Sequence, residues 1–109
     1  MTESPEARTL RENLSEIATA ISSQESGPTW FADQLWQEGF SINRDILSAT
    51  GKGNYWKASQ LLQMVEVRVR ASYGNTAAEF LKVVNILMKE GAYKNIATHL
   101  QQEYGELTK

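Results

Sequence analysis

Apolar residues recur along the chain at the three- and four-residue steps of an amphipathic helix, in segments separated by glycine. In the first segment, Leu10, Leu14, Ile17 and Ile21 follow one another at steps of four, three and four. Five further segments have apolar positions Trp30, Phe31, Leu35 and Trp36; Ile42, Ile46 and Leu47; Ala58, Leu61, Leu62, Val65 and Val69; Ala77, Phe80, Leu81, Val84, Leu87 and Met88; and Tyr93, Ile96, Ala97, Leu100 and Tyr104. The pattern therefore predicts six helices.

Glycines and prolines mark the expected ends of these helices. The glycines fall between the segments, and glycine in a helix interior costs about 1 kcal/mol relative to alanine, so we expect them in turns and at helix ends. Pro5 follows Ser4, and Pro28 follows Gly27. In each pair we expect the first residue to be the N-cap and the proline to open the helix.

Two further local signals bear on where helices begin. The third segment offers Ser41 as its N-cap, since a serine hydroxyl can accept a hydrogen bond from the first turn. In the fifth segment Thr76 precedes Glu79 by three residues, which predicts a capping box at the start of that helix. Beyond the predicted helices, we expect residues 1–4 and 105–109 to fray.

One stretch, Val65–Arg70, gives a conflicting signal. Polar and apolar residues alternate strictly through it, and its apolar members are all valine, which is typical of a strand. However, the preceding residues 57–64 favour a helix and contain no helix breaker, and no other segment alternates to provide a partner strand. We therefore predict that the fourth helix continues through this stretch.

The predicted fold class is all-α. Six amphipathic helices in about 100 residues can bury their apolar stripes only against one another, which gives a compact antiparallel six-helix bundle. A chain of 109 residues is also the size of one domain. We expect a single domain over residues 1–109, with its core at about residues 5–104.

Composition narrows the function classes. Thirteen acidic and eleven basic residues give a formal net charge of −2, so nucleic acid is not an expected partner. The chain contains no cysteine, so we expect no disulfide, thiol nucleophile or cysteine-bound metal. The absence of an apolar run near 20 residues, and of an apolar signal core in Met1–Arg11, predicts a cytoplasmic protein without membrane contact.

No motif for catalysis, metal binding or cofactor binding emerges. His99 is the only histidine, and a surface or boundary position is expected for it rather than a role as general base or metal ligand. The segment 51–54 contains Gly51, Lys52 and Gly53 before a predicted helix, but it lacks the length and the Ser or Thr of a phosphate-binding loop. We expect a non-enzymatic protein with no catalytic residues, metal or cofactor.

An alternative is a small helical DNA-binding domain of the helix-turn-helix type. The fourth predicted helix carries polar residues that could contact bases or phosphates, namely Lys57, Gln60, Gln63, Arg68 and Arg70. The same helix is apolar nearly all round, which is typical of a buried central helix rather than a recognition helix.

Four stretches resemble a known family. They are Trp30–Phe40; Asp45–Leu47; Lys57–Leu62 with Val65 and Val69; and Phe80–Leu81 with Val84, Ile86, Leu87, Ile96, Ala97 and Leu100. In order and spacing they resemble helices two to six of the death-fold superfamily, most closely the caspase recruitment domain. The similarity covers about residues 8–104, and includes the family's K-A-x-x-L-L pattern in the fourth helix. Death-effector and death domains share most of these features, so the subfamily stays open.

The resemblance implies a Greek-key bundle and a homotypic interaction module. Such domains bind other death-fold domains, including copies of themselves, and assemble oligomers or filaments in cell-death (apoptosis) or innate-immune signalling. The family often pairs a basic face on helices one and four with an acidic face on helices two and three. Here the corresponding protein-interaction residues are Arg8, Arg11, Lys57 and Arg68 on the basic side and Asp33, Glu38 and Asp45 on the acidic side.

Helical geometry supports part of this assignment. Lys57, Met64 and Arg68 fall on one face at 100° per residue. The chain departs from the family at Tyr55 and Ser59, where we align basic residues of the family. The alternative that all seven charges are ordinary solvated residues stays open.

Aromatic residues present a similar choice between core and interface. Of Trp30, Trp36 and Tyr55, we expect at least two in the core, since large aromatics are mostly buried. The remainder would face a partner, because Trp and Tyr are enriched in binding interfaces.

Overall fold

The chain folds into α-helices and short 3₁₀ turns throughout the part that the computed structural model describes, residues 4–72 and 74–108. The elements of that part, in order, are α1 Pro5–Glu12, α2 Leu14–Ser22, α3 Gly27–Gln37, the 3₁₀ helix η1 Arg44–Ile46, α4 Asn54–Ala71, α5 Thr76–Met88, the 3₁₀ helix η2 Gly91–Tyr93 and α6 Lys94–Leu107. No strand occurs in these residues, so the all-α prediction is confirmed. The stretch Val65–Arg70 is helical, as predicted.

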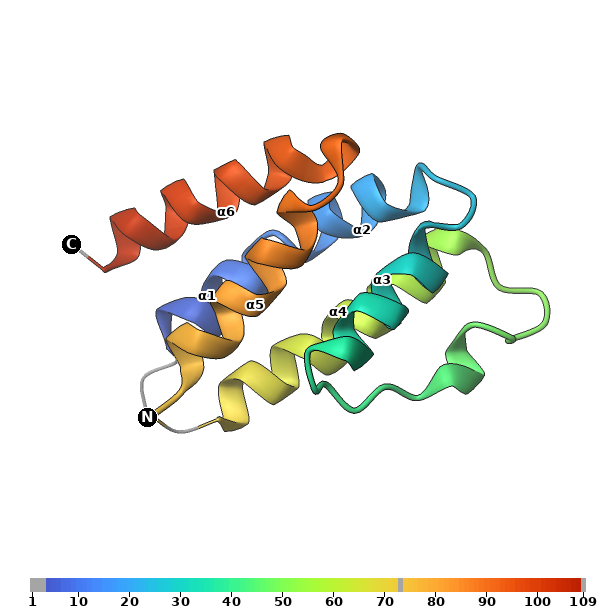
Figure 1. The fold of residues 1–109 in the computed structure, drawn as a ribbon, viewed down its shortest axis with the longest axis horizontal. Coiled ribbons are helices and arrows are strands. Elements are labelled where there is room, and N and C mark those ends of the chain that lie inside the picture. Colours follow the sequence, from blue (N-terminus) through green and yellow to red (C-terminus); the bar gives the residue numbers. More distant parts are fainter. Residues whose placement is uncertain (1–3, 73, 109) are drawn as a thin grey trace.

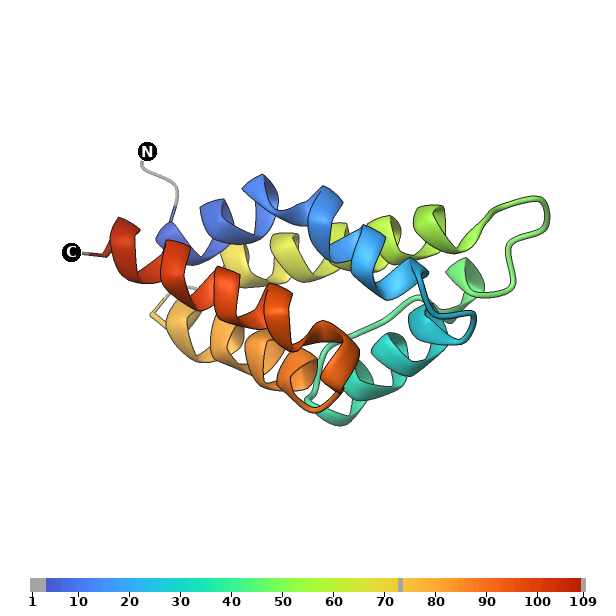
Figure 2. The same ribbon diagram turned by 90° about the horizontal axis from the view of Figure 1, so that it is seen from above.

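Helix α4 is the longest helix and lies at the centre of the packing. It contacts α1, α2, α3, α5 and η1. In Figure 1, α4 runs antiparallel to the α1–α2 pair, and Figure 2 shows α5 and α6 side by side and antiparallel. The Cα radius of gyration is 13.1 Å, close to the value of about 13 Å for a compact chain of this length.

The apolar stripes meet in one core. Every member of the α4 stripe, from Ala58 to Val69, is buried, together with Phe31 and Leu35 of α3 and Leu100 of α6. These side chains belong to one contiguous cluster of buried residues. The buried residues named here on α3, α4 and α6 are therefore apolar positions that the helical period predicts.

The first predicted helix is two helices. It breaks at Asn13, whose backbone φ of −109° and ψ of 8° lie outside the helical range. The Asn13 side-chain amide donates to the Thr9 carbonyl at 2.8 Å and to Glu103 Oε2 at 2.6 Å. Asparagine competes with the helical backbone for hydrogen bonds, which favours it at helix ends. The apolar period survives the break, because Ile17 and Ile21 are fully buried.

The third predicted helix is only the short 3₁₀ helix η1. Its N-cap is Asn43 rather than Ser41, and Asn43 Oδ1 accepts from the backbone N–H of Asp45 at 3.1 Å. Ile42 and Leu47 on either side are half-buried and pack against the core. Two apolar contacts hold this segment against the bundle without a longer helix.

The start of α5 also differs from the prediction. The capping box does not form, since Asn75 is the N-cap and Thr76 is already helical. The Thr76 hydroxyl instead donates to Glu6 Oε1 at 3.0 Å, in a contact across the bundle. The helix is packed on two sides, so Val83 and Ile86 are buried, whereas Ala77, Leu81 and Met88 of the expected stripe are exposed.

The proline and glycine signals at the helix ends are partly confirmed. Ser4 caps α1, and its Oγ accepts from the Ala7 N–H at 3.2 Å. Helix α3 is preceded by Ser26 as N-cap, so Gly27 is its first residue. Gly105 lies inside α6 rather than after it. Of the ends expected to fray, residues 105–107 are helical, and residues 1–3 and 109 lie outside the described part.

Gly27 is required because backbone and side chain approach it closely. A Cβ at this position would lie 1.9 Å from the Ile21 carbonyl oxygen and 3.1 Å from the Tyr93 hydroxyl. Since the nearest atom belongs to the backbone, any larger residue would force α2 and α3 apart.

We predict opposite effects for the same substitution at two helical glycines. Gly27→Ala should lower the free energy of unfolding by more than about 1 kcal/mol, because the backbone must shift. Gly105→Ala has no atom within 4 Å of the added Cβ, and should raise stability by up to about 1 kcal/mol through its helix propensity. Urea unfolding monitored by circular dichroism measures both; equal effects would contradict the packing at Gly27.

A second prediction concerns the core of α4. Leu62 is 2% exposed, so Leu62→Ala should lower the free energy of unfolding by about 2–5 kcal/mol through lost burial and a residual cavity. Val67→Ala on the same helix is the matched control, because Val67 is 50% exposed and its truncation should change stability little. Thermal and urea unfolding of both variants check the result.

Candidate interaction surfaces

The predicted basic residues lie on α1 and α4, two helices in contact. Arg8 is exposed on α1 and forms an ion pair with Glu12, with Nε to Oε1 at 2.7 Å, while Arg11 is exposed in the last turn of the same helix. On α4, Lys57 is half-buried near the first turn. Within residues 4–72 and 74–108 no ion pair involves Lys57, so its charge can meet a partner.

Arg68 at the other end of α4 has a defined position. Its Nη1 donates to the Gly39 carbonyl at 3.3 Å, and its guanidinium carbon lies 5.3 Å from the centroid of the Phe40 ring. Gly39 adopts a positive φ of 89°, which turns the chain after α3 and presents this carbonyl to α4. Arg68 therefore connects α4 to the turn after α3 while remaining partly exposed.

The predicted acidic residues lie on α3 and around η1. Asp33 pairs with Arg44, with Oδ1 to Nη2 at 2.8 Å, and both side chains are about half exposed. Glu38 is the C-cap of α3, and its carbonyl accepts from Lys82 Nζ at 3.5 Å. Asp45 is exposed, and no ion pair involves it among the described residues. The Asp33–Arg44 pair brings α3 and η1 together and partly neutralises this surface.

An open groove of about 390 Å³ runs beside α4. Val67, which lines it, is 50% exposed, and Met64 beside it is half-buried. The full lining is Ser41, Gln60, Gln63, Met64, Val67 and Arg68. Helical geometry predicts Met64 on one face with Lys57 and Arg68. It does not predict the exposure of Val67, which lies within the alternating valine run.

The expectation that at least two of Trp30, Trp36 and Tyr55 are core residues is wrong. Trp36 is 64% exposed and Tyr55 is 47% exposed, and Trp30 is partly buried against the core. Trp36 directly follows the fully buried Leu35, so the two side chains leave α3 in different directions and the indole faces away from the core. The Tyr55 hydroxyl is 3.1 Å from the Ser15 hydroxyl, which connects α4 to α2.

Three glutamates of the described part of the chain are buried, and the sequence pattern does not reveal them. Glu6, Glu66 and Glu79 are each at most 9% exposed, and each has one carboxylate oxygen without a hydrogen-bond partner. Glu66 pairs with Arg70 and Glu79 with Lys82, each at 3.4 Å. In these two pairs a basic residue about one helical turn away reaches over the carboxylate, which keeps the buried charge close to a more exposed cation.

Glu6 links three helices that are far apart in the sequence. Its Oε1 accepts hydrogen bonds from the Thr76 hydroxyl at 3.0 Å and from the Tyr104 hydroxyl at 3.4 Å. Burial raises the pKa of Tyr104 above its usual value near 10, and the negative charge of Glu6 and this hydrogen bond raise it further. Tyr104 therefore keeps its proton to higher pH in the folded chain.

His99 lies at the boundary of the bundle, as predicted. Its Nε2 is 3.1 Å from Glu103 Oε1 on the same helix and 3.9 Å from Glu16 Oε2 on α2. In the described residues no three His, Cys, Asp or Glu side chains are placed to hold a metal ion. Glu103 also accepts from Asn13, so this small network connects α6 to the break between α1 and α2.

The segment before α4 is a turn. Gly51 has a positive φ of 77°, and Lys52 Nζ lies 5.3 Å from the centroid of the Trp56 ring. The Asn54 side chain donates to the Glu25 carbonyl at 3.1 Å, which attaches the start of α4 to the α2–α3 connection. None of the helices in the described part combines the length and apolar character that crossing a membrane requires.

Comparisons with protein-family models, curated proteins and solved structures found no match to the chain.

We predict a pH dependence that identifies the Glu6–Tyr104 contact. Because the pKa of Tyr104 is raised in the folded state, its contribution to stability is fully present below about pH 10 and is lost as the pH rises through the folded-state pKa. In Tyr104→Phe, the unfolding free energy should therefore fall less steeply from about pH 9 to about pH 12 than in the wild type. Urea unfolding at a series of pH values measures this; parallel curves would contradict it.

Proposed function

We propose that this chain is a non-enzymatic interaction module that binds other copies of its own fold. The observation that supports this proposal most strongly is that one molecule carries a basic surface and a separate acidic surface. One surface is the α4 groove with Arg68 in its lining and Lys57 on the same helix, and the other consists of Asp33 and Asp45 on α3 and η1. A surface of each charge on every copy allows the basic surface of one molecule to meet the acidic surface of the next.

The charged residues differ in how easily they could engage a partner. Lys57 and Asp45 take part in no ion pair among the residues that the structure describes, so a partner charge would not have to displace an existing one. Asp33 would exchange Arg44 for a residue of the partner, and exposed ion pairs of this kind contribute only about 0–1 kcal/mol. Lys57 and Asp45 are therefore the residues on which the proposed contact depends most directly.

Exposed apolar side chains would supply the rest of the binding energy. Trp36 and Val67 are at least half exposed, on α3 and α4 respectively. Tryptophan is enriched among the residues that dominate interface energies, and arginine, like Arg68 here, is also enriched. An interface that buries these groups would combine an apolar centre with a charged rim.

The proposed contact joins two different surfaces, which has a consequence for assembly. A contact between unlike surfaces leaves one free surface of each kind at the ends, so it generates a ring if the rotation closes and a filament if it does not. The resemblance to caspase recruitment domains favours the same arrangement. It also favours a Greek-key helix order, a cytoplasmic location, and death-fold partners in cell-death or innate-immune signalling.

The DNA-binding alternative has less support. A recognition helix must present several base-contacting side chains to a groove. Helix α4 packs against α1, α2, α3 and α5, and its outward side includes the exposed Val67. A gel-shift assay at low and moderate salt tests the alternative, and salt-dependent DNA binding would favour it over self-association.

The central prediction uses opposite charge reversals. Lys57→Glu and Asp45→Lys should each weaken self-association, because each places like charges in the proposed contact. An equimolar mixture of the two variants should recover association, since the glutamate introduced into one variant can pair with the lysine introduced into the other. Light scattering over a series of chain and salt concentrations measures this, and moderate salt should weaken the wild-type assembly.

Controls separate binding from folding. Lys94→Glu changes an exposed charge at the start of α6 by the same amount as Lys57→Glu, and should leave association unchanged. All three variants should keep the wild-type thermal midpoint, because the changed side chains form no ion pair in the described fold. A wild-type chain that stays monomeric at every concentration would refute the proposal, as would equal effects of Lys94→Glu and Lys57→Glu.

A further inference from the structure

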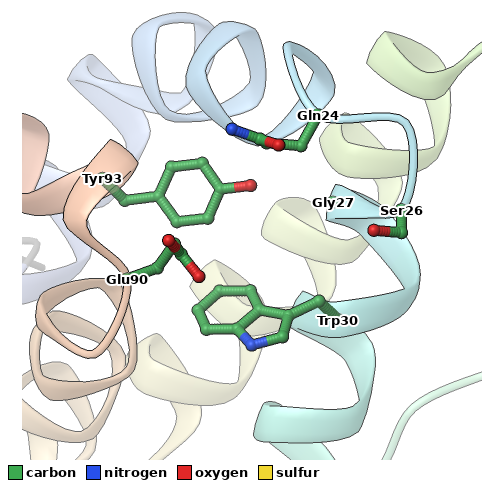
Figure 3. Close-up of a pocket in the computed structure, with 6 residues that line it drawn as sticks. All are labelled: Gln24, Ser26, Gly27, Trp30, Glu90 and Tyr93. Carbon is green, nitrogen blue, oxygen red and sulfur yellow. The ribbon is translucent and has the colours of Figure 1, made fainter.

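A second, smaller cavity lies on a part of the molecule that the proposed contact does not use. It has a volume of about 110 Å³, several times the space that one water molecule needs. Figure 3 shows the side chains that surround it, which come from the α2–α3 connection, from α3 and from the segment after α5. They are Gln24, Ser26, Gly27, Trp30, Glu90 and Tyr93.

Two aromatic rings form one wall of the cavity. The Trp30 and Tyr93 ring centroids are 5.4 Å apart, with an angle of 45° between the ring planes. In Figure 3 the Glu90 carboxylate is drawn near both rings, and Glu90 lines the same cavity. Glu90 is exposed, and no ion pair involves it within residues 4–72 and 74–108. A negative charge beside aromatic rings, with no ion-pair partner among the described residues, is favourable for a cation and unfavourable for an anion.

The Tyr93 hydroxyl is the second polar group of the cavity. Tyr93 is only 2% exposed, yet no hydrogen bond from its hydroxyl to another described residue is present. In Figure 3 this hydroxyl points past Gly27 toward the open space between Gln24, Ser26 and Trp30. Burial and the charge of Glu90 both raise the pKa of Tyr93, so its hydroxyl is neutral at pH 7 and can accept a hydrogen bond. The hydroxyl is not among the buried unpaired side-chain atoms of the described residues, so it is open to the cavity, where a donor of a ligand can reach it.

These features together select one kind of ligand. An apolar group would displace water from the Tyr93 hydroxyl without replacing its hydrogen bonds, and an anion would be repelled by Glu90. An ammonium group carries three donors and one positive charge, which match a carboxylate, a hydroxyl and aromatic faces. Its attached methylene groups can lie against the Trp30 ring.

We infer that the Trp30–Glu90–Tyr93 cavity binds an alkylammonium group. The inference does not depend on self-association through α4, since none of the residues of that contact lines this cavity. The ammonium group would come either from a lysine side chain of a protein or from a free amine, and the two sources share the same chemistry.

The test uses n-butylammonium as the probe and the Trp30 indole N–H as the reporter. In a ¹⁵N–¹H correlation spectrum of the full chain, titration at constant ionic strength should move the Trp30 signal along a saturable curve, with millimolar affinity. Trp30→Phe assigns that signal among those of the three tryptophans. The neutral n-butanol should produce no saturable shift over the same range, because it lacks the charge that Glu90 recognises.

Variants define the contribution of each group. Glu90→Gln keeps the shape of the side chain and should weaken binding at least about threefold, as expected for loss of a partly exposed charge pair. Tyr93→Phe keeps the ring and should also weaken binding. Glu106→Gln, an equal loss of charge on α6 away from the lining residues, should leave the affinity unchanged. The inference fails if n-butanol binds equally well, or if Glu90→Gln and Glu106→Gln have the same affinity.

A final measurement distinguishes the two sources of the ammonium group. In one outcome, the Trp30 indole signal shifts further as the chain concentration rises, and n-butylammonium reverses this shift. That result would support binding and assign the ligand to a lysine of a second copy. Saturable n-butylammonium binding without such concentration dependence would support binding and assign the natural ligand to another molecule. An Nα-acetyl-lysine amide should then compete with n-butylammonium for the same signal.

Discussion

Burial of α4 is the constraint on which the rest of the structure depends. Helices α1, α2, α3 and α5 all pack against it, so most of the apolar surface of the bundle is arranged around this helix. The apolar stripe of α4, from Ala58 to Val69, combines small and branched residues. Each of its side chains is at most 2% exposed. This packing also explains why the valines of the alternating stretch are helical: Val65 and Val69 lie one turn apart and enter the core, whereas Val67 points outward.

Polar contacts between the chain ends complete the packing. Asn13 reaches Glu103, and Glu6 reaches both Thr76 and Tyr104, so the first helices are connected to α5 and α6 by partly buried hydrogen bonds. Such contacts contribute less stability than the apolar core, because carboxylates lose hydration when they are buried. They specify how the helices are placed relative to one another, since an apolar surface alone tolerates sliding and a hydrogen bond does not.

The same packing leaves two distinct regions available for binding. Helices α3 and α4 cover the core with one side and expose Trp36, Val67 and part of Lys57 on the other, which supports the proposed self-association. At the start of α3, the close approach of α2 to Gly27 leaves the cavity beside Trp30 and Tyr93. The interaction surface depends on charges visible in the sequence, whereas the cavity depends on a backbone approach that no sequence pattern reports.

The sequence by itself determined the helical class, the glycine turns after α3 and before α4, and the buried stripe of α4, because helical period and glycine conformation are local properties. It also located the seven candidate charges, but it could not show that Asp33 pairs with Arg44, or that Lys57 and Asp45 form no ion pair within the described part of the chain. Only the tertiary structure decided the break at Asn13, the shifted stripe of α5, the burial of Glu6 and the exposure of Trp36. Each of these depends on which residues of distant segments lie opposite, and a one-dimensional pattern of apolar positions does not contain that information.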